Sequence, residues 1–264
     1  MDYLVAVGRF RDSVRKAKAR LAGREADEGV RADAPDATLD ATYPEVPSPL
    51  RRAAPLPGSD GEKELQALHG NTRRAAAFYD KQVLAHLNER MRRFVSRQEM
   101  AFIATADAKG DCDSSFRFGP VGFFRVLNDS LVTYPEYRGN GVMASLGNIL
   151  ENPHIGVMFI DWERTVGLHV NGRAEILEAD EMKAHPQVTE EVLADMRGEG
   201  KKRVQRWVLI HVEEAYIHCS KHIPFMKKDK KDVHWGTDSE RYKGGDYFAA
   251  KASSRPWKLD NENG

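Results

Sequence analysis

Short apolar runs joined by tight turns dominate the middle of the chain, and they constrain its fold more than any other feature. Ala108–Asp111 and Asn128–Asp129 are typical of hairpin turns, and Gly172 lies inside a long alternating run as a bulge would. Strands spaced regularly in this way favour a closed antiparallel barrel of about six strands over a parallel sheet. The expected strands are residues 101–107, 114–118, 121–127, 130–134, 154–161, 166–177 and 206–218.

Segments with helical periodicity lie before and between these strands in the sequence. Residues 62–97 repeat apolar side chains at spacings of three and four, with a break after Gly70. Residues 144–152 predict a short helix that Pro153 ends, and residues 187–197 predict another. We therefore expect helices that flank the barrel.

The composition changes along the chain and predicts four parts. Residues 1–24 form an amphipathic basic helix, which covers part of the same protein or docks on a partner or an anionic membrane. Residues 25–60, rich in Asp, Ala and Pro, form an extended linker or strap. Residues 61–226 then hold the barrel with its preceding helices, and residues 227–264 form a charged tail.

Charge and cysteine content exclude several classes of function. Lys+Arg and Asp+Glu balance at 40 each, so the whole protein has no electrostatic attraction to nucleic acid. Two cysteines, Cys112 and Cys219, are too few for a disulfide framework. The first residues are not a secretory signal, and no apolar run is long enough to span a membrane. These features predict a cytoplasmic protein.

One segment, from Tyr134 to Pro153, has the composition of an anion-binding loop. A strand end leads into Arg138 and Gly-Asn-Gly, and a short helix begins after them. Helix-start N–H groups, glycines and a guanidinium favour a phosphate, and Ser145 and Asn148 add neutral hydrogen bonds. Such loops are also common as ordinary turns, and this one is neither a Walker A loop nor a dinucleotide fingerprint.

Several histidines are candidate ligands. His218 and Cys219 are neighbours on one strand, so their side chains point to opposite faces and cannot converge on a metal ion. We therefore expect no metal site. His169 alternates with apolar neighbours and is interpreted as a structural residue, while His222 is a hypothetical pocket residue on position alone.

Several stretches in order, about half of the chain, resemble the pyridoxamine 5′-phosphate oxidase-like flavin-binding split barrels. The resemblance implies a mainly β (α+β) fold: a six-stranded antiparallel split β-barrel with flanking helices, here with an N-terminal helical extension. It also implies a homodimer with FMN at the subunit interface. The matching stretches are residues 102–107, 114–123, 138–153 and 168–175, with residues 212–224 as the closing strand.

The resemblance also suggests which residues hold the cofactor. In such proteins the strand matching Ser114–Phe118 runs beside the flavin, and the strand end matching Tyr134 and its loop hold the phosphate. The Arg-Lys pair that usually grips the phosphate is absent, with Ala144 near its place, so pyridoxamine phosphate is not the expected substrate. The cofactor-binding candidates are Ser115, Phe116, Arg117, Tyr134, Arg138, Asn140, Ser145 and Asn148.

These observations predict an FMN-dependent oxidoreductase that acts on a small molecule, with catalytic residues that the sequence does not identify. Arg117 is expected to stabilise the reduced flavin. A deazaflavin-dependent reductase on the same fold is the first alternative. The second is a non-catalytic flavin- or haem-binding protein, in which His169, His218 or His222 is an axial ligand.

Overall fold

The structure, a computed structural model, describes residues 57–197, 204–229, 232–234, 237, 239–253 and 255. The predicted helix over residues 1–24 and the predicted linker up to residue 56 lie outside these described residues. Internal contacts divide the chain into two units, one that ends at Gln82 and one that begins at Val83. This division falls inside residues 61–226, which the sequence predicts to be one domain.

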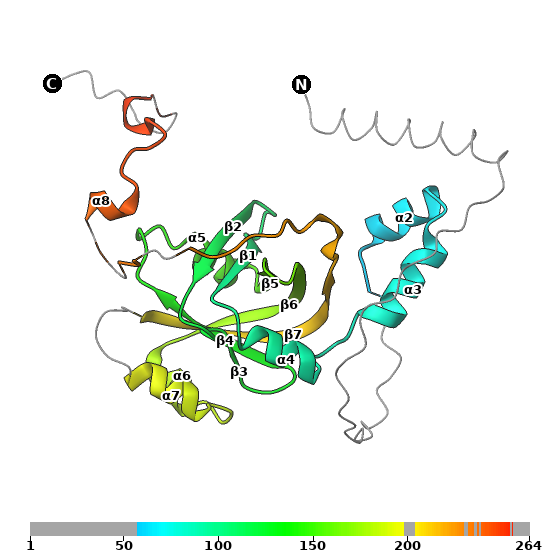
Figure 1. Cartoon of the computed structure of the whole chain (residues 1–264), viewed down its shortest axis with the longest axis horizontal. Coiled ribbons are helices and arrows are strands. Elements are labelled where there is room, and N and C mark those ends of the chain that lie inside the picture. The colour runs from blue at the N-terminus through cyan, green and yellow to red at the C-terminus, as the bar shows by residue number, and fades with distance from the viewer. Residues whose placement is uncertain are drawn as a thin grey trace. The chain divides into compact units, whose positions relative to one another are not determined.

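The first unit contains two helices, α2 (Asp60–Leu68) and α3 (Thr72–Gln82), drawn in blue to cyan in Figure 1. The Ser59 hydroxyl accepts the Glu62 N–H at 3.1 Å and so caps the start of α2. The Tyr79 hydroxyl of α3 donates to the Glu62 carboxylate at 3.1 Å. The break predicted after Gly70 separates the two helices, with a φ of 66° at Gly70.

The second unit is built on one sheet of seven strands in the order β2-β1-β5-β6-β7-β4-β3, and every neighbouring pair is antiparallel (Figure 1). The predicted α+β split-barrel class is confirmed, and the sheet has seven strands where the resemblance implies a six-stranded barrel. The strands are β1 (Met100–Ala106), β2 (Cys112–Phe118), β3 (Arg125–Val126), β4 (Leu131–Tyr137), β5 (His154–Asp161), β6 (Val166–Leu177) and β7 (Val204–His218).

The segment before β3 departs from the sequence-based prediction. Residues 121–127 were expected as a strand, but only Arg125–Val126 is one. The Phe123 N–H donates to the Pro120 carbonyl at 2.9 Å and closes a turn there. Gly122 lies in the turn with a φ of 72°, which favours glycine. A turn therefore forms where the apolar run predicted the start of a strand.

A bulge interrupts the pairing of β6 with β7, as predicted at Gly172. Asn171 pairs with Glu214 and Gly172 pairs with Val212, so β7 holds one extra residue, Glu213. A Cβ atom on Gly172 would lie 2.0 Å from the His211 carbonyl oxygen. Glycine is therefore required for this close approach of the two backbones.

The core lies between the curved sheet and its helices. Its centre is aromatic: the Phe124 ring lies 4.6 Å from Tyr134 and 4.9 Å from Phe159, centroid to centroid. A second, smaller cluster surrounds Trp207, which is buried together with Met182 from the helices between β6 and β7. β7 contributes to both clusters, because Trp207 and its neighbour Val208 point to opposite faces.

The helices of this unit pack mainly against inner strands of the sheet. The predicted helical run to residue 97 is interrupted where Leu84 forms a bridge with Ala215, and α4 begins after the Asn88 cap. α5 packs on β1 and β6, and α6 on β6 and β7. No helix in the described ranges is long and apolar enough to cross a bilayer. The bounds are α4 (Glu89–Val95), α5 (Ala144–Glu151), α6 (Ala179–Ala184), α7 (Glu190–Arg197) and α8 (Glu240–Lys243), with 3-10 turns at Ser220–His222 and Ala250–Ala252.

Candidate functional site

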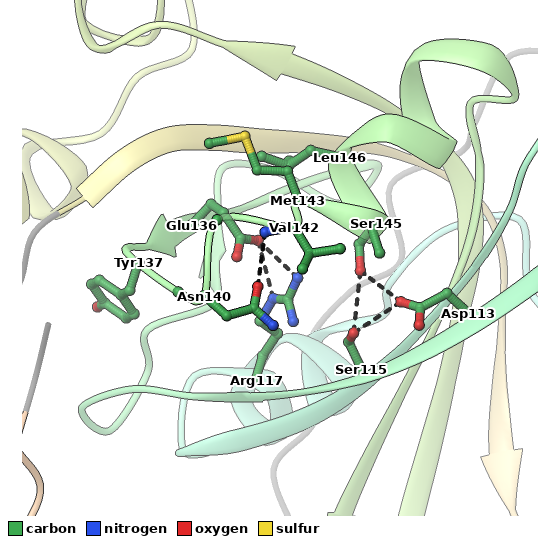
Figure 2. A pocket seen from close by; sticks show the side chains of 13 residues that line it. Asp113, Ser115, Arg117, Glu136, Tyr137, Asn140, Val142, Met143, Ser145 and Leu146 are labelled. Carbon is green, nitrogen blue, oxygen red and sulfur yellow. Dashed lines mark hydrogen bonds and ion pairs between the residues drawn. The ribbon is translucent and has the colours of Figure 1, made fainter. Parts of the chain in front are cut away.

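A cavity of about 420 Å³ lies where β2, the end of β4 and the start of α5 meet (Figure 2). One wall comes from alternate residues of β2, which share a face because strand side chains alternate. The opposite wall comes from the loop between β4 and α5. The lining consists of Asp113, Ser115 and Arg117 of β2, Glu136 and Tyr137 of β4, and residues 139–146.

The start of α5 faces this cavity. Met143, the residue before the helix, has a left-handed φ of 56°, and no side chain of the described residues caps the helix there. The first intrahelical N–H bond is that of Gly147 to the Met143 carbonyl, at 2.8 Å. The N–H groups of Ala144, Ser145 and Leu146 therefore have no acceptor within the helix. The positive end of the helix dipole adds to them and favours an anion or a polar oxygen at this place.

The loop that leads into α5 is held by its own side chain. The Asn140 carboxamide oxygen accepts the Val142 N–H at 2.9 Å. Gly141, between these residues, has a φ of 85°. The loop therefore presents glycine backbone to the cavity, together with the side chains of Asn140, Val142 and Met143.

Two serines and one carboxylate form a cluster on the cavity wall. The Ser115 and Ser145 hydroxyls donate to Asp113 Oδ2 at 3.0 and 3.1 Å, and the two hydroxyl oxygens are 3.3 Å apart. Figure 2 shows this triangle, which ties β2 to the first turn of α5. The cluster offers both donors and an acceptor, which suits hydroxyl groups of a ligand.

An ion pair forms the other side of the wall. Arg117 Nε and Nη2 both lie 3.0 Å from Glu136 Oε2, and the two side chains are only 17% and 14% exposed. Burial raises the pKa of the Glu136 carboxyl above its ordinary value, and the Arg117 guanidinium opposes that rise. Desolvation therefore outweighs the ion pair at this carboxylate.

Tyrosine hydroxyls near the cavity are held neutral. Burial, together with the nearby Asp195 carboxylate, raises the pKa of Tyr137 to about 12. Burial also raises the pKa of Tyr134 well above its ordinary value. The Tyr134 hydroxyl makes no hydrogen bond to any residue that the structure describes.

Four of the predicted cofactor residues are brought together in this cavity. Ser115, Arg117, Asn140 and Ser145 line it. They come from β2, from the loop before α5 and from the first turn of α5.

The other four predicted residues lie outside the lining. Phe116 points to the opposite face of β2, half-exposed against Phe102, because neighbours on a strand alternate. Tyr134 is fully buried in the aromatic core. Asn148 donates to the Thr105 hydroxyl at 3.1 Å, and Arg138 lies at the loop beside the cavity without lining it.

Sequence reasoning missed the two acidic residues of the site. Asp113 lies two residues before Ser115, and Glu136 lies two residues after Tyr134. Alternation places Asp113 on the cavity face of β2, so the signal for this residue was present. The pairing of Glu136 with Arg117 could not be predicted from the sequence, because it depends on how β4 approaches β2.

The candidate histidines lie elsewhere. His169 and His218 do not line the cavity but are hydrogen-bonded to each other, Nε2 to Nδ1, at 2.9 Å. Burial and the neighbouring His218 lower the pKa of His169.

A second hollow of about 550 Å³, lined by β1, β5, β6 and β7, contains Cys112, His154 and Glu214, and none of the predicted cofactor residues.

Comparison with known proteins identifies the family. The family model described as pyridoxamine 5′-phosphate oxidase matches residues 87–219. No curated protein matches the chain.

Several solved structures are similar to this chain over about half of its length. HupZ of Group A Streptococcus is 25% identical, with 50% of this chain and 94% of that chain covered and a TM-score of 0.38. A putative pyridoxamine 5′-phosphate oxidase from Lactobacillus delbrueckii is 20% identical, covering 51% and 98%, with a TM-score of 0.38. HutZ, the haem storage protein from Vibrio cholerae, is 16% identical, covering 50% and 94%, with a TM-score of 0.33.

The family match contains every residue of the cavity described above. It spans half of the chain, and the chain therefore belongs to the pyridoxamine 5′-phosphate oxidase family.

Proposed function

We propose that the protein is an FMN-dependent oxidoreductase that acts on a small molecule. The observation that carries this proposal is the uncapped start of α5, which opens into a cavity with the Ser115 and Ser145 hydroxyls in a chain of this family. Bound FMN would supply the electron-transfer chemistry. The chain's own residues would bind it, orient it and shield it from water.

The cavity lining suits a phosphorylated polyol, which neutral N–H and hydroxyl groups would bind more than charged side chains would. The first N–H groups of α5 and the Ser145 hydroxyl are donors for a phosphate. Asp113 and Ser115 are suited to the hydroxyls of a ribityl chain. Two carboxylates line the cavity against one guanidinium, Arg117, and that guanidinium is already paired with Glu136. Phosphate binding would therefore depend mainly on the backbone and the hydroxyls.

Arg117 is assigned a second role towards the flavin ring. A guanidinium near the pyrimidine edge stabilises the negative charge of the reduced flavin and raises the reduction potential. Its pairing with Glu136 fixes its position in the wall. If the Arg117→Ala variant kept the wild-type flavin potential, this role would be excluded.

The proposal includes a homodimer with the cofactor at the subunit interface. Val142 and Met143 line the cavity and are 71% and 48% exposed. Apolar side chains at an open site are suited to burial by a second copy of the chain, which would also shield the flavin from water. Light scattering of the purified full chain measures this directly, and a monomer with bound FMN would contradict it.

The first experiment is the absorbance spectrum of the purified chain, followed by heat release of any ligand. We expect an oxidised-flavin spectrum and free FMN in the supernatant. A colourless protein that does not bind added FMN would overturn the proposal. Parallel titrations with a deazaflavin coenzyme and with haem separate the two alternatives, because each gives its own spectrum.

Adjacent serines on β2 provide a matched control for the site. Ser115 lines the cavity, while Ser114 is exposed on the opposite face. Loss of one ligand hydrogen bond of about 1 kcal/mol predicts a roughly fivefold weaker affinity for FMN in Ser115→Ala. Ser114→Ala is expected to bind FMN as the wild type does. Equal affinities in the two variants would place the ligand elsewhere.

A further inference from the structure

Two histidines from different strands meet on the outer side of the sheet, away from the proposed flavin cavity. β6 and β7 pair so that His169 lies opposite Tyr216 and Gly167 lies opposite His218. His169 and His218 are therefore diagonal neighbours that share one face. Their Nε2 and Nδ1 atoms are 2.9 Å apart, and both side chains are partly exposed.

The surroundings hold both rings in this arrangement. The His169 ring stacks on Tyr216, with centroids 4.7 Å apart and planes 17° from parallel. A Cβ atom on Gly167 would lie 2.8 Å from His218 Cβ, so the glycine makes room for the His218 side chain. Neither ring is hydrogen-bonded to a carboxylate of the described residues, so packing and their mutual contact orient them.

The distance between the two nitrogens indicates which metal geometry they suit. Imidazole nitrogens bind first-row divalent metals at about 2.0–2.1 Å. At that length, nitrogens 2.9 Å apart subtend an angle of about 90° at the metal, whereas a tetrahedral site needs about 3.4 Å. A right angle is the cis arrangement of square-planar or octahedral sites, which copper(II) and nickel(II) prefer over zinc(II).

Metal binding would break the hydrogen bond between the two rings. Imidazole binds a metal through the lone pair of an unprotonated ring nitrogen. The ring that now donates would shift its proton to its other nitrogen, so that His169 Nε2 and His218 Nδ1 would both offer lone pairs to the ion. Both rings are partly exposed, so a metal ion can reach them from solvent.

We propose that His169 and His218 form a binding site for a divalent transition metal ion of the copper–nickel type. Water would complete the coordination, since the described residues contain no group of three or more His, Cys, Asp or Glu side chains suited to one ion. Two neutral ligands give a weaker site than a full protein cage. The site does not depend on the proposed flavin function.

The test is metal titration of the untagged full chain after treatment with a chelator. Calorimetry with copper(II), nickel(II) and zinc(II) gives stoichiometry and affinity, and electron paramagnetic resonance of the copper form counts the bound nitrogens. We expect one copper ion per chain with two imidazole nitrogens, and nickel bound at least as tightly as zinc. His169→Gln and His218→Gln should each weaken copper binding at least tenfold.

Two further histidines are matched controls. His211 lies on the same strand as His218 but contacts Glu175, and His222 is exposed shortly after β7. His211→Gln and His222→Gln are expected to bind copper as the wild type does. Thermal melts with and without copper separate lost binding from misfolding, because copper should raise the melting temperature of the controls but not of His169→Gln. No bound copper, a single nitrogen, or unchanged affinity in His169→Gln and His218→Gln would overturn the proposal.

Discussion

Replacing Arg117 with alanine would leave the Glu136 carboxylate in the cavity wall without the guanidinium that now contacts it. Both Arg117 nitrogens lie 3.0 Å from the same carboxylate oxygen. The change therefore removes both contacts at once. It also leaves β2 and β4 without this link across the cavity.

The exposure of the pair sets the magnitude of the effect. Removing one partner of a fully buried ion pair costs about 3–5 kcal/mol, whereas exposed pairs contribute about 0–1 kcal/mol. The two side chains are 17% and 14% exposed and face a cavity that admits water. We therefore expect a loss of roughly 2 kcal/mol in the free energy of unfolding near neutral pH.

The loss should depend on pH in a direction that the structure fixes. Burial already raises the pKa of Glu136 in the folded state, and removal of Arg117 raises it further. The folded variant then binds a proton that the unfolded chain has released, so its stability falls as pH rises between the unfolded and folded pKa values. The difference between wild type and variant is therefore smallest in acid and largest above the folded pKa.

Urea unfolding at about pH 5 and about pH 8 measures both effects. The double variant Arg117→Ala, Glu136→Gln should recover part of the lost stability at the higher pH, because no unpaired carboxylate remains. Arg164→Ala is the control, since Arg164 is 69% exposed in its pair with Asp161. A loss that is equal at both pH values, or that the double variant does not reduce, would refute the reasoning.

Three further substitutions test the fold. Gly172→Ala should destabilise the protein by about 3 kcal/mol in chemical denaturation, because its methyl group would overlap the His211 carbonyl oxygen. Phe124→Ala should cost about 3–5 kcal/mol in the same assay, since the ring lies at the centre of the aromatic core. Arg125→Ala should cost about 1 kcal/mol and increase hydrogen exchange in α7, because Arg125 donates to both Asp195 oxygens at 2.6 and 2.7 Å.

Two controls accompany these substitutions. Gly147→Ala places a methyl group where no atom lies within 4 Å, so it should be neutral or slightly stabilising in α5. Arg93→Ala removes an exposed pair with Glu89 and should change stability by less than about 0.5 kcal/mol. If Gly147→Ala destabilised as much as Gly172→Ala, the close approach at the bulge would not be the cause.

Local patterning was enough to predict most strands. β5 and β6 have the bounds expected from their apolar alternation, because both are long and flanked by clear turns. Gly172 was recognisable as a bulge because a glycine in a long strand has no side chain to pack. The expected strand before β3 failed because Phe123 and Phe124 are buried from a turn, and burial alone does not distinguish a turn from a strand.

The sequence predicted those parts of the candidate site whose residues belong to a single continuous element. The loop before α5 was found because glycines and a helix start are adjacent in the sequence. Phe116 was included with Ser115 and Arg117 although alternation points it to the other face. The meeting of His169 with His218 depends on the register of β6 against β7, which no single-strand pattern contains.

The extra residue at Glu213 has a consequence for how this chain can change in length. Side chains before and after it keep their faces only because one residue is skipped in the pairing of β7 with β6. Deleting Glu213 would make Val212 and Glu214 adjacent, opposite Gly172 and Asn171, so a regular ladder would keep every other side chain on its present face. Inserting one further residue into β7 would instead turn one half of the strand over and exchange buried for exposed positions along it. Natural variants should therefore tolerate many residue types at position 213, and its deletion, while single insertions and deletions elsewhere in β7 are eliminated.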